Sequence, residues 1–392
     1  MNPAQLVMRR CEELAAISDE PHCLTRSFHS PAMIRANRLV GSWMRQTGLA
    51  VRQDAAFNLF GRRASSQPGA RTFLIGSHLD TVRNAGKYDG PLGVLIAIAA
   101  VENLRRRGVT LPFHLEVAGF SDEEGLKYQV SYLGSRALAG TLAAADLARI
   151  REKQIARARR PRGQIMGYAE VHIEQGPVLE EKDLAVAVVR AIAGQSRLRV
   201  EFRGCAGHAG TVPMTSRHDA LAGAAEFVLA VERCGVTATV GQLEVSPGAS
   251  NVIPGHASLT LDVRHENDAR RCRTLRSLRA TAKKIARQRQ LRLTWNSIQE
   301  TAAVKCDGKL SRLLGSCLAA RGLDALKMTS GAGHDAAALS AICPVAMLFV
   351  RCRGGISHHP SESVRVPDVK IALEVFTDFL IALAAHHSTR QK

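Results

Sequence analysis

Apolar runs that end in short polar segments recur along the first half of the chain. The segment 71–82 (RTFLIGSHLDTV) has the pattern of a buried strand that ends in polar residues, and 111–125 and 168–176 repeat it. Between the first two, the apolar run 90–108 predicts a buried helix that stops at a glycine. Strands alternating with helices predict an α/β fold, in which functional groups gather at the carboxyl ends of the strands.

The pattern changes near Gly194, where apolar and polar residues alternate as in half-exposed strands. From there the chain has the order β-α-β-β-α-β, with strands at 195–204, 238–248, 257–267 and 291–299 and helices at 216–235 and 269–288. This order predicts a small two-layer α+β domain inserted in a larger one.

After about Ala303 the apolar strand pattern returns in 344–355, and a helix is predicted at 368–387. The first twenty residues predict an amphipathic helix. A chain of 392 residues is too long for one ordinary core. We therefore expect a large domain built from 1–193 and 304–392, with 194–303 as the insert.

Composition removes several classes of protein. The formal charge is +18, but the Lys and Arg residues are spread along the chain and aromatic residues make up only 4%, so we expect no nucleic-acid binding. The densest basic run, 151–163, predicts a solvated helix and loop, while the overall charge favours an anionic small substrate.

The chain has no apolar window long enough for a bilayer, since the best candidate, 93–101, has only the length of a core helix. It has no apolar signal segment at its start. Its nine cysteines are scattered and form no C-x-x-C pair. We therefore expect a cytoplasmic protein with reduced thiols and no membrane partner.

His78 and Asp80 stand two residues apart at the end of a predicted strand, so their side chains leave on the same side. Asp80 could then fix the tautomer of a metal-bound imidazole. Asp89 follows in a glycine-flanked loop, where the backbone can come close to an ion. Alone, these residues would indicate only a surface turn.

Glu123 and Glu124 are adjacent after the second apolar strand. Neighbouring carboxylates repel each other, and a divalent cation that binds one leaves the other free to act as general base. The alternative is an acidic helix N-terminus. His172 and His358 follow two further strands, although the adjacent His359 leaves the second ligand open. Together these residue types are the ligands of a two-metal hydrolase.

The motifs around these residues resemble those of M20-type, aminoacylase-like metallopeptidase relatives. The likeness is strongest to the branch of allantoate amidohydrolases and N-carbamoyl-L-amino-acid hydrolases, and within it to plant-type allantoate amidohydrolases. The matching segments span nearly the whole chain: GSHLDTV, GKYDGPLG, FSDEEG, YLGSRALAG, EVHIEQGPVLE, AGHAGTVPM, SNVIPG, DVRH, SGAGHDA and MLFVRCRGGISHHPSE.

The resemblance implies an α/β fold, with a mixed-sheet di-metal hydrolase domain and an inserted dimerisation and lid domain. It implies two divalent metal ions per subunit, Mn or Zn with Co possible. One ion would be held by His78, His172 and Asp89, and the other by Asp89, Glu124 and His358. Glu123 would be the general base.

In the inserted domain, Gln195, Asn251 and Arg264 match positions that bind the substrate carboxylate. His208 matches a histidine that stabilises the oxyanion in the site of the partner subunit, which implies a homodimer. The family usually has Asn or Ser where His359 stands.

The implied reaction is hydrolysis of a ureido C–N bond in an anionic small molecule, with allantoate giving ureidoglycine, ammonia and carbon dioxide. The alternative within the family is an N-carbamoyl-L-amino-acid hydrolase. A peptidase is disfavoured because HIEQG has His172 where peptidase relatives usually present a carboxylate. A more remote alternative is a non-catalytic binding protein on a hydrolase scaffold.

Overall fold

The computed structural model describes residues 2–389, which form two compact units. Among these residues, unit 1 comprises 2–190 and 306–389, and unit 2 comprises 191–305. The fold is α/β, with a mixed sheet in unit 1 and a two-layer arrangement in unit 2, as the sequence pattern predicted.

Unit 1 is built on a sheet with the strand order β1-β2-β4-β3-β5-β16-β6, to which β15 adds beside β6. The two-residue strand β14, where the chain returns from unit 2, continues this order after β6. The central strands β4, β3, β5 and β16 are parallel, and the outer neighbours are antiparallel. The strands are β1 (Ala50–Gln53), β2 (Leu59–Arg63), β3 (Thr72–His78), β4 (His114–Phe120), β5 (Ile165–Ile173), β6 (Val186–Ile192), β14 (Val304–Lys305), β15 (Lys327–Ser330) and β16 (Val345–Val350).

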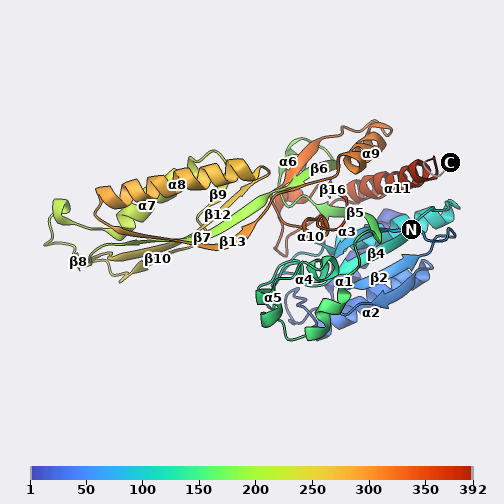
Figure 1. Cartoon of the computed structure of the whole chain (residues 1–392), viewed down its shortest axis with the longest axis horizontal. Coiled ribbons are helices and arrows are strands. Elements are labelled where there is room, and N and C mark those ends of the chain that lie inside the picture. Colours follow the sequence, from blue (N-terminus) through green and yellow to red (C-terminus); the bar gives the residue numbers. More distant parts are fainter. Residues whose placement is uncertain (1, 390–392) are drawn as a thin grey trace. The chain divides into compact units, whose positions relative to one another are not determined.

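The helices of unit 1 cover this sheet (Figure 1). They are α1 (Pro3–Ala15), α2 (Pro31–Gln46), α3 (Pro91–Arg106), α4 (Leu133–Ala139), α5 (Ala144–Arg149), α6 (Val178–Glu181), α9 (Gly308–Ala319), α10 (Asp335–Leu339) and α11 (Val366–Thr389), with the 3-10 turns η1 (Lys153–Ala158) and η3 (Arg353–Gly355). Helix α3 is apolar on almost all sides and shares one core with α1, α2, α9 and α11. The predicted helices at the two ends of the chain and at 90–108 are confirmed.

The basic run 151–163 forms η1 and flanking loops. Ile155 and Ala158 are buried there, while most of the cations are exposed. Arg160 is an exception, since it donates to Glu116 at 2.6 Å. The run is therefore largely a solvated segment, as predicted.

Unit 2 has two layers, with two helices on one face of a five-stranded sheet of order β10-β12-β7-β13 in which β9 also pairs with β12 (Figure 1). Its elements are β7 (Gly194–Arg203), β8 (Gly207–His208), η2 (Met214–Ser216), α7 (Ala220–Glu232), β9 (Thr237–Thr239), β10 (Leu243–Ser246), β11 (Val252–Ile253), β12 (His256–His265), α8 (Asp268–Gln288) and β13 (Arg292–Thr301).

The single strand expected at 238–248 is divided into β9 and β10. Both pair with β12, but β9 pairs with its last residues and β10 with its first. Between them, the Gln242 amide donates to the Thr260 hydroxyl at 3.1 Å in place of a regular ladder bond. The interruption explains the difference, because a period-two pattern does not mark a local break in pairing.

Candidate metal centre and substrate site

The parallel strands of unit 1 bring the predicted metal-binding residues to one edge of the sheet. His78 ends β3, Glu123 and Glu124 follow β4, His172 lies near the end of β5, and His358 follows β16. The order β4-β3-β5-β16 makes these strands neighbours, so their carboxyl ends meet.

Asp89 lies at the centre of three imidazoles. Its Oδ1 is 3.1 Å from His172 Nε2 and 3.7 Å from His78 Nε2, and its Oδ2 is 2.9 Å from His358 Nε2. Asp89, His78 and His172 are buried. Gly90, which follows Asp89, has a φ of 81°, and a Cβ at this position would lie only 2.4 Å from the His78 ring. Glycine therefore allows the loop that carries Asp89 to pass close to His78.

The tautomers of two of these histidines are set by backbone carbonyls. Nδ1 of His78 lies 3.1 Å from the Asp80 carbonyl oxygen, and Nδ1 of His172 lies 2.9 Å from the Ile173 carbonyl oxygen. A carbonyl can only accept, so Nδ1 carries the hydrogen and the Nε2 lone pair of each neutral ring faces Asp89. Two acceptors then oppose each other, an arrangement that a divalent cation between them would satisfy.

The donor set divides into two groups that share Asp89. The first is His78, Asp89 and His172, and the second is Asp89, Glu124 and His358, with the ligand atoms of each group within 4.8 Å of one another. Without a cation, hydrogen bonds to Asp89 and Glu124 raise the pKa of His358 to about 10. Mixed imidazole and carboxylate groups of this kind fit two first-row divalent ions.

His358, rather than the adjacent His359, lies at this centre. Its Nε2 is also 3.3 Å from Glu124 Oε1, and its backbone has a left-handed φ of 56°. The ring of His359 instead accepts a hydrogen bond from the Ser361 amide at 3.1 Å. The left-handed backbone conformation of His358 costs free energy, and residues held in it are concentrated at functional sites.

Asp80 differs from the expectation that its carboxylate would hold the imidazole. That carboxylate lies 3.6 Å from His78 Nδ1, farther than the carbonyl oxygen of the same residue. Its two oxygens instead accept from the amides of Glu123 and Glu124, at 3.1 and 3.2 Å. Asp80 therefore has two structural roles. Its backbone carbonyl orients His78, and its side chain fixes the loop that carries Glu123 and Glu124.

Glu123 is buried beside His78 and Glu124, with ligand atoms within 4.8 Å. Burial raises the pKa of Glu123 well above its usual range, and the charges of Glu124, Asp335 and Asp80 add to that effect while His78 opposes it. A carboxyl group with a raised pKa is suited to proton transfer near neutral pH.

Three residues that support Asp89 had no role assigned from the sequence. Glu362 Oε1 accepts from the amides of Tyr88 and Asp89, at 2.7 and 3.1 Å, and its Oε2 lies 3.1 Å from the Ser357 hydroxyl oxygen. Ser357 and the Gln175 amide both donate to Asp89 Oδ2 at 3.0 Å. The segments HIEQG (172–176) and SHHPSES (357–363) contain all three, but sequence spacing did not reveal that they contact Asp89.

His334 is a second feature that spacing did not reveal. Its ring packs edge-on against His172 at 4.5 Å between centroids, and its Nε2 pairs with the Ser330 hydroxyl at 2.7 Å. Burial lowers the pKa of His334 well below its usual value, so it is neutral. Nearby Glu170 accepts from Ser77 and from the Ala336 amide. The polar atoms of His334 and Glu170 are thus hydrogen-bonded within the protein, and the His334 ring packs behind His172 as a structural support.

In unit 2, Gln195 and Arg264 face each other across β7 and β12. Both bind Asp262: Arg264 donates to its two oxygens at 3.1 and 2.9 Å, and Gln195 donates at 2.6 Å. Burial works to raise the pKa of Asp262, but these bonds and the charges of Arg264 and Arg197 hold it below its usual value. Asp262 is therefore the residue that orients this pair.

His208 and Asn251 form a separate pair. His208 lies on β8, which pairs with β11, and the Ala209 amide donates to the Asn251 carbonyl at 2.9 Å. His208 and Asn251 come after the end of β7 that is opposite to Gln195. Strand β7 is about 30 Å long at the usual rise of a strand. Within one chain, Gln195 therefore lies beside Arg264, and His208 lies beside Asn251. The two pairs are at opposite ends of β7.

His208 is exposed, and its Nδ1 accepts a hydrogen bond from the Gly210 amide at 3.1 Å. The neutral ring therefore carries its hydrogen on Nε2, where it can be donated to a ligand. This is the tautomer that a donor to a developing oxyanion requires.

The family model for peptidase family M20/M25/M40 matches residues 74–382, a range that contains every predicted metal ligand. The chain belongs to this family. It is a hydrolase, as the resemblance implied. Among residues 2–389, no helix of this M20 hydrolase has the length and apolar content to span a membrane.

Named relatives of this M20 chain act on amide-type C–N bonds. It is 37% identical to an N-carbamoyl-L-amino acid amidohydrolase of Geobacillus stearothermophilus, covering 96% of this chain and 97% of the relative. It is 38% identical to an allantoate deiminase of Arabidopsis thaliana, covering 95% and 81%. A crystal structure of a hydantoinase/carbamoylase family amidase from Burkholderia multivorans has a TM-score of 0.91, with 29% identity and coverage of 97% and 98%.

Proposed function

We propose that this protein is a dimetal amidohydrolase that cleaves a ureido C–N bond, with allantoate as the substrate. The observation that carries the proposal is Asp89, whose carboxylate meets the Nε2 atoms of three histidines, two of them held as Nδ1–H tautomers by backbone carbonyls. The favoured alternative is an N-carbamoyl-L-amino acid as the substrate, since relatives at nearly equal identity bear both names.

His78, His172 and Asp89 would hold one divalent ion, and Asp89, Glu124 and His358 the other. Manganese and zinc both suit these ligands, and cobalt does too. When bound, such ions polarise a carbonyl group and lower the pKa of water. The support for two ions is that both groups share the Asp89 carboxylate, one oxygen facing each group.

Glu123 is the proposed general base. It takes a proton from the attacking water and returns that proton to the leaving nitrogen. Its raised pKa supports both transfers, because a carboxylate that binds the proton firmly can also carry it until the C–N bond breaks. Asp80 and the loop it fixes hold Glu123 in place.

The substrate carboxylate is assigned to Arg264 with Gln195, and the oxyanion to His208, with Asn251 beside it. Arg264 presents a planar guanidinium oriented by Asp262, which suits a charge-assisted bond to a carboxylate. Because His208 and Asn251 lie beyond the far end of β7, we propose a homodimer in which each chain supplies this pair to the site of its partner. Unit 2 would then close over the substrate as a lid.

The proposed compartment is the cytoplasm. All nine cysteines are free thiols, and four of them are buried. Free thiols in this number suit a reducing environment.

Turnover of metal-reconstituted protein on allantoate, compared with a panel of N-carbamoyl-L-amino acids, tests the substrate. We expect the highest kcat/KM on allantoate, with ammonia released. A higher kcat/KM on an N-carbamoyl-L-amino acid would reassign the substrate and keep the dimetal mechanism. An absence of turnover on every ureido compound by metal-loaded protein would contradict the proposed function and favour a binding protein on this scaffold.

Two metal ions should bind each chain. Elemental analysis after mild purification should approach two divalent ions, chelator should abolish activity, and manganese should restore it, because the ligands form two groups around Asp89. His22→Ala, which changes an exposed histidine in unit 1, should leave the metal content unchanged. A content that stays at one ion under metal excess would contradict the two-metal site.

Arg264→Ala should mainly raise KM. The substitution removes a guanidinium that would bind the substrate carboxylate, a charge-assisted bond worth about 1.5–3 kcal/mol, so KM should rise about 10–100-fold. The matched control is Arg197→Ala, which removes another cation bonded to Asp262. Equal effects of the two variants on KM would show that Arg264 acts only through Asp262.

A further inference from the structure

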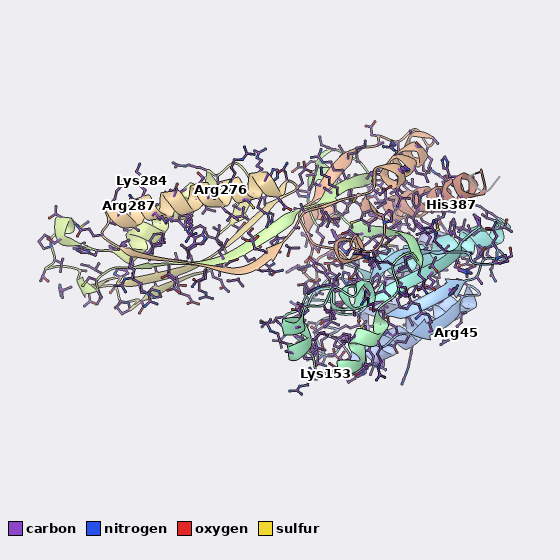
Figure 2. The ribbon with its side chains drawn as sticks, viewed as in Figure 1. Arg45, Lys153, Arg276, Lys284, Arg287 and His387 are labelled. Carbon is purple, nitrogen blue, oxygen red and sulfur yellow. The ribbon has the colours of Figure 1, made fainter. Side chains whose placement is uncertain are left out.

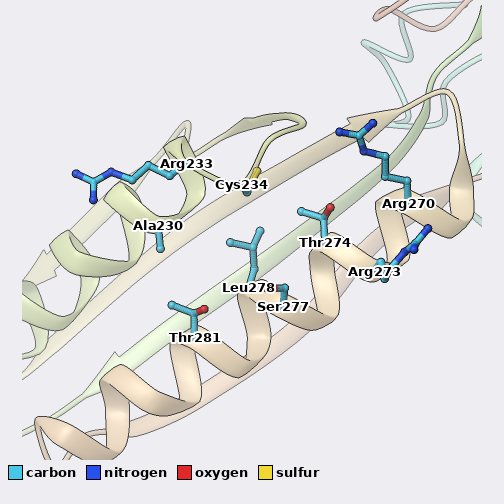
Figure 3. Close-up of a pocket in the computed structure, with 9 residues that line it drawn as sticks. All are labelled: Ala230, Arg233, Cys234, Arg270, Arg273, Thr274, Ser277, Leu278 and Thr281. Atoms are coloured by element: carbon cyan, nitrogen blue, oxygen red, sulfur yellow. The ribbon is translucent and has the colours of Figure 1, made fainter.

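A pocket lies between α7 and α8, the two helices of unit 2. It has a volume of about 560 Å³, within the range of small-ligand sites. Its polar lining consists mainly of three arginines and three hydroxyl-bearing residues: Arg233, Arg270, Arg273, Thr274, Ser277 and Thr281. Figure 3 shows Thr274 and Thr281 projecting from α8 on the side of α7, with Arg270 at the start of α8 and Arg233 at the end of α7.

The three pocket arginines have no carboxylate partner in the part of the chain that the structure describes. Arg270 donates to the Gly235 carbonyl at 3.2 Å, which ties the start of α8 to the loop after α7. Arg271, in the same turn, provides the contrast: it is buried and donates to Glu300 and Asp268 at 3.0 and 2.9 Å. The charge of Arg271 is compensated within the fold, whereas the charges in the pocket are not.

Helix α8 adds to the positive potential at this pocket. It carries eight Lys and Arg residues and a single acidic residue, Asp268. Its packing against the sheet uses Leu278, Ala282 and Ile285. The exposed cations, among them Arg276 and Arg287 in Figure 2, are therefore not needed for the core of unit 2.

We propose that this pocket binds a short phosphate chain, as found in inorganic or nucleoside oligophosphates. Guanidinium groups bind phosphate oxygens in a bidentate manner, and the hydroxyls of Thr274 and Ser277 supply neutral donors in the same pocket. A chain of phosphates fits better than a single one, because the polar lining extends along α8 from Arg270 to Thr281, about 16 Å at the usual rise of a helix. The lining has no aromatic residue, so a nucleobase would add little by stacking.

The test is calorimetric titration of the full-length, metal-loaded protein with tripolyphosphate, ATP and orthophosphate at about 0.15 M salt, where distant charges are screened. Tripolyphosphate and ATP should bind with similar Kd, and orthophosphate at least about tenfold more weakly, because it can engage only one end of the pocket. A Kd for ATP far below that for tripolyphosphate would overturn the proposal in favour of a nucleoside site.

Two double variants separate a pocket from a merely basic surface. Arg270→Gln with Arg273→Gln removes two charges that line the pocket, and Arg276→Gln with Arg287→Gln removes two from the same helix outside it. The first should weaken tripolyphosphate binding by about 100-fold, roughly tenfold for each guanidinium, and the second by less than about threefold. Both keep the metal site, so any chelation of metal by the ligand affects them equally.

Equal weakening by the two double variants would show non-specific attraction to α8 and would overturn the proposal. So would the absence of binding by the unmodified protein. Thermal melts of both variants verify that unit 2 is folded, since all four side chains are exposed and none belongs to its core. The titration measures phosphate binding and not turnover, so its outcome does not depend on whether the protein hydrolyses a ureido bond.

Discussion

Glu123→Gln should lower kcat by about 10²–10⁴-fold, the usual contribution of a general base, with both metal ions still bound. Glutamine has nearly the same shape as glutamate but cannot accept the proton of the attacking water. The loop should keep its position because it is held through the backbone, where the Glu123 amide donates to Asp80 and its carbonyl accepts from the Tyr132 amide at 2.7 Å.

The pH dependence provides a second measurement on the same variant. A base acts in its deprotonated form, and burial raises the pKa of Glu123. In the unmodified enzyme kcat/KM should therefore rise with pH on the acid side and level off once Glu123 has lost its proton. The glutamine variant should lack this rise, because the group that titrates is gone.

The neighbouring Glu124→Gln is the matched comparison, since it makes the same chemical change one residue away. Glu124 faces His358 and Asp89, so this variant should lose metal rather than turnover per bound metal. Full activity per bound metal in Glu123→Gln, together with equal loss of metal in both variants, would reverse the roles given to the two glutamates.

His208→Ala should lower kcat by about 10²–10³-fold with metal content intact, the usual cost of removing one oxyanion donor. Because Nδ1 of His208 accepts a hydrogen bond from the Gly210 amide, the hydrogen that His208 can donate is on Nε2, and alanine has no such donor. His22→Ala serves as a control for loss of an exposed histidine. An unchanged kcat in His208→Ala would remove His208 from the reaction.

Mixing the two inactive variants tests whether His208 acts in the partner's site. In a mixed dimer of Glu123→Gln and His208→Ala chains, one site combines an intact Glu123 with an intact His208 from the other chain. At equal mixing about half of the dimers are mixed and each has one competent site, so activity should return to roughly a quarter of the unmodified level. No recovery after demonstrated subunit exchange would mean that His208 serves its own chain.

The sequence by itself determined the local elements and the chemical types at the strand ends. The apolar run of 90–108 specified a helix buried on nearly all sides, and the runs before His78, Glu123 and His172 specified buried strands. Both follow from periodicity, which depends on neighbours a few residues apart. The assignment of individual ligands came from the resemblance to a family rather than from periodicity.

Only the tertiary structure decided which atoms meet. The strand order β4-β3-β5-β16 brings segments from 78 to 358 to one edge, and no local pattern encodes that order. The tautomers of His78 and His172 depend on carbonyl oxygens, which every residue has and no sequence pattern marks. Glu362 contacts the amide of Asp89 from 273 residues away. Likewise, the antiparallel register of β7 and β12 places Gln195 with Arg264 and leaves His208 and Asn251 beyond the far end of the sheet, a separation set by long-range hydrogen bonding.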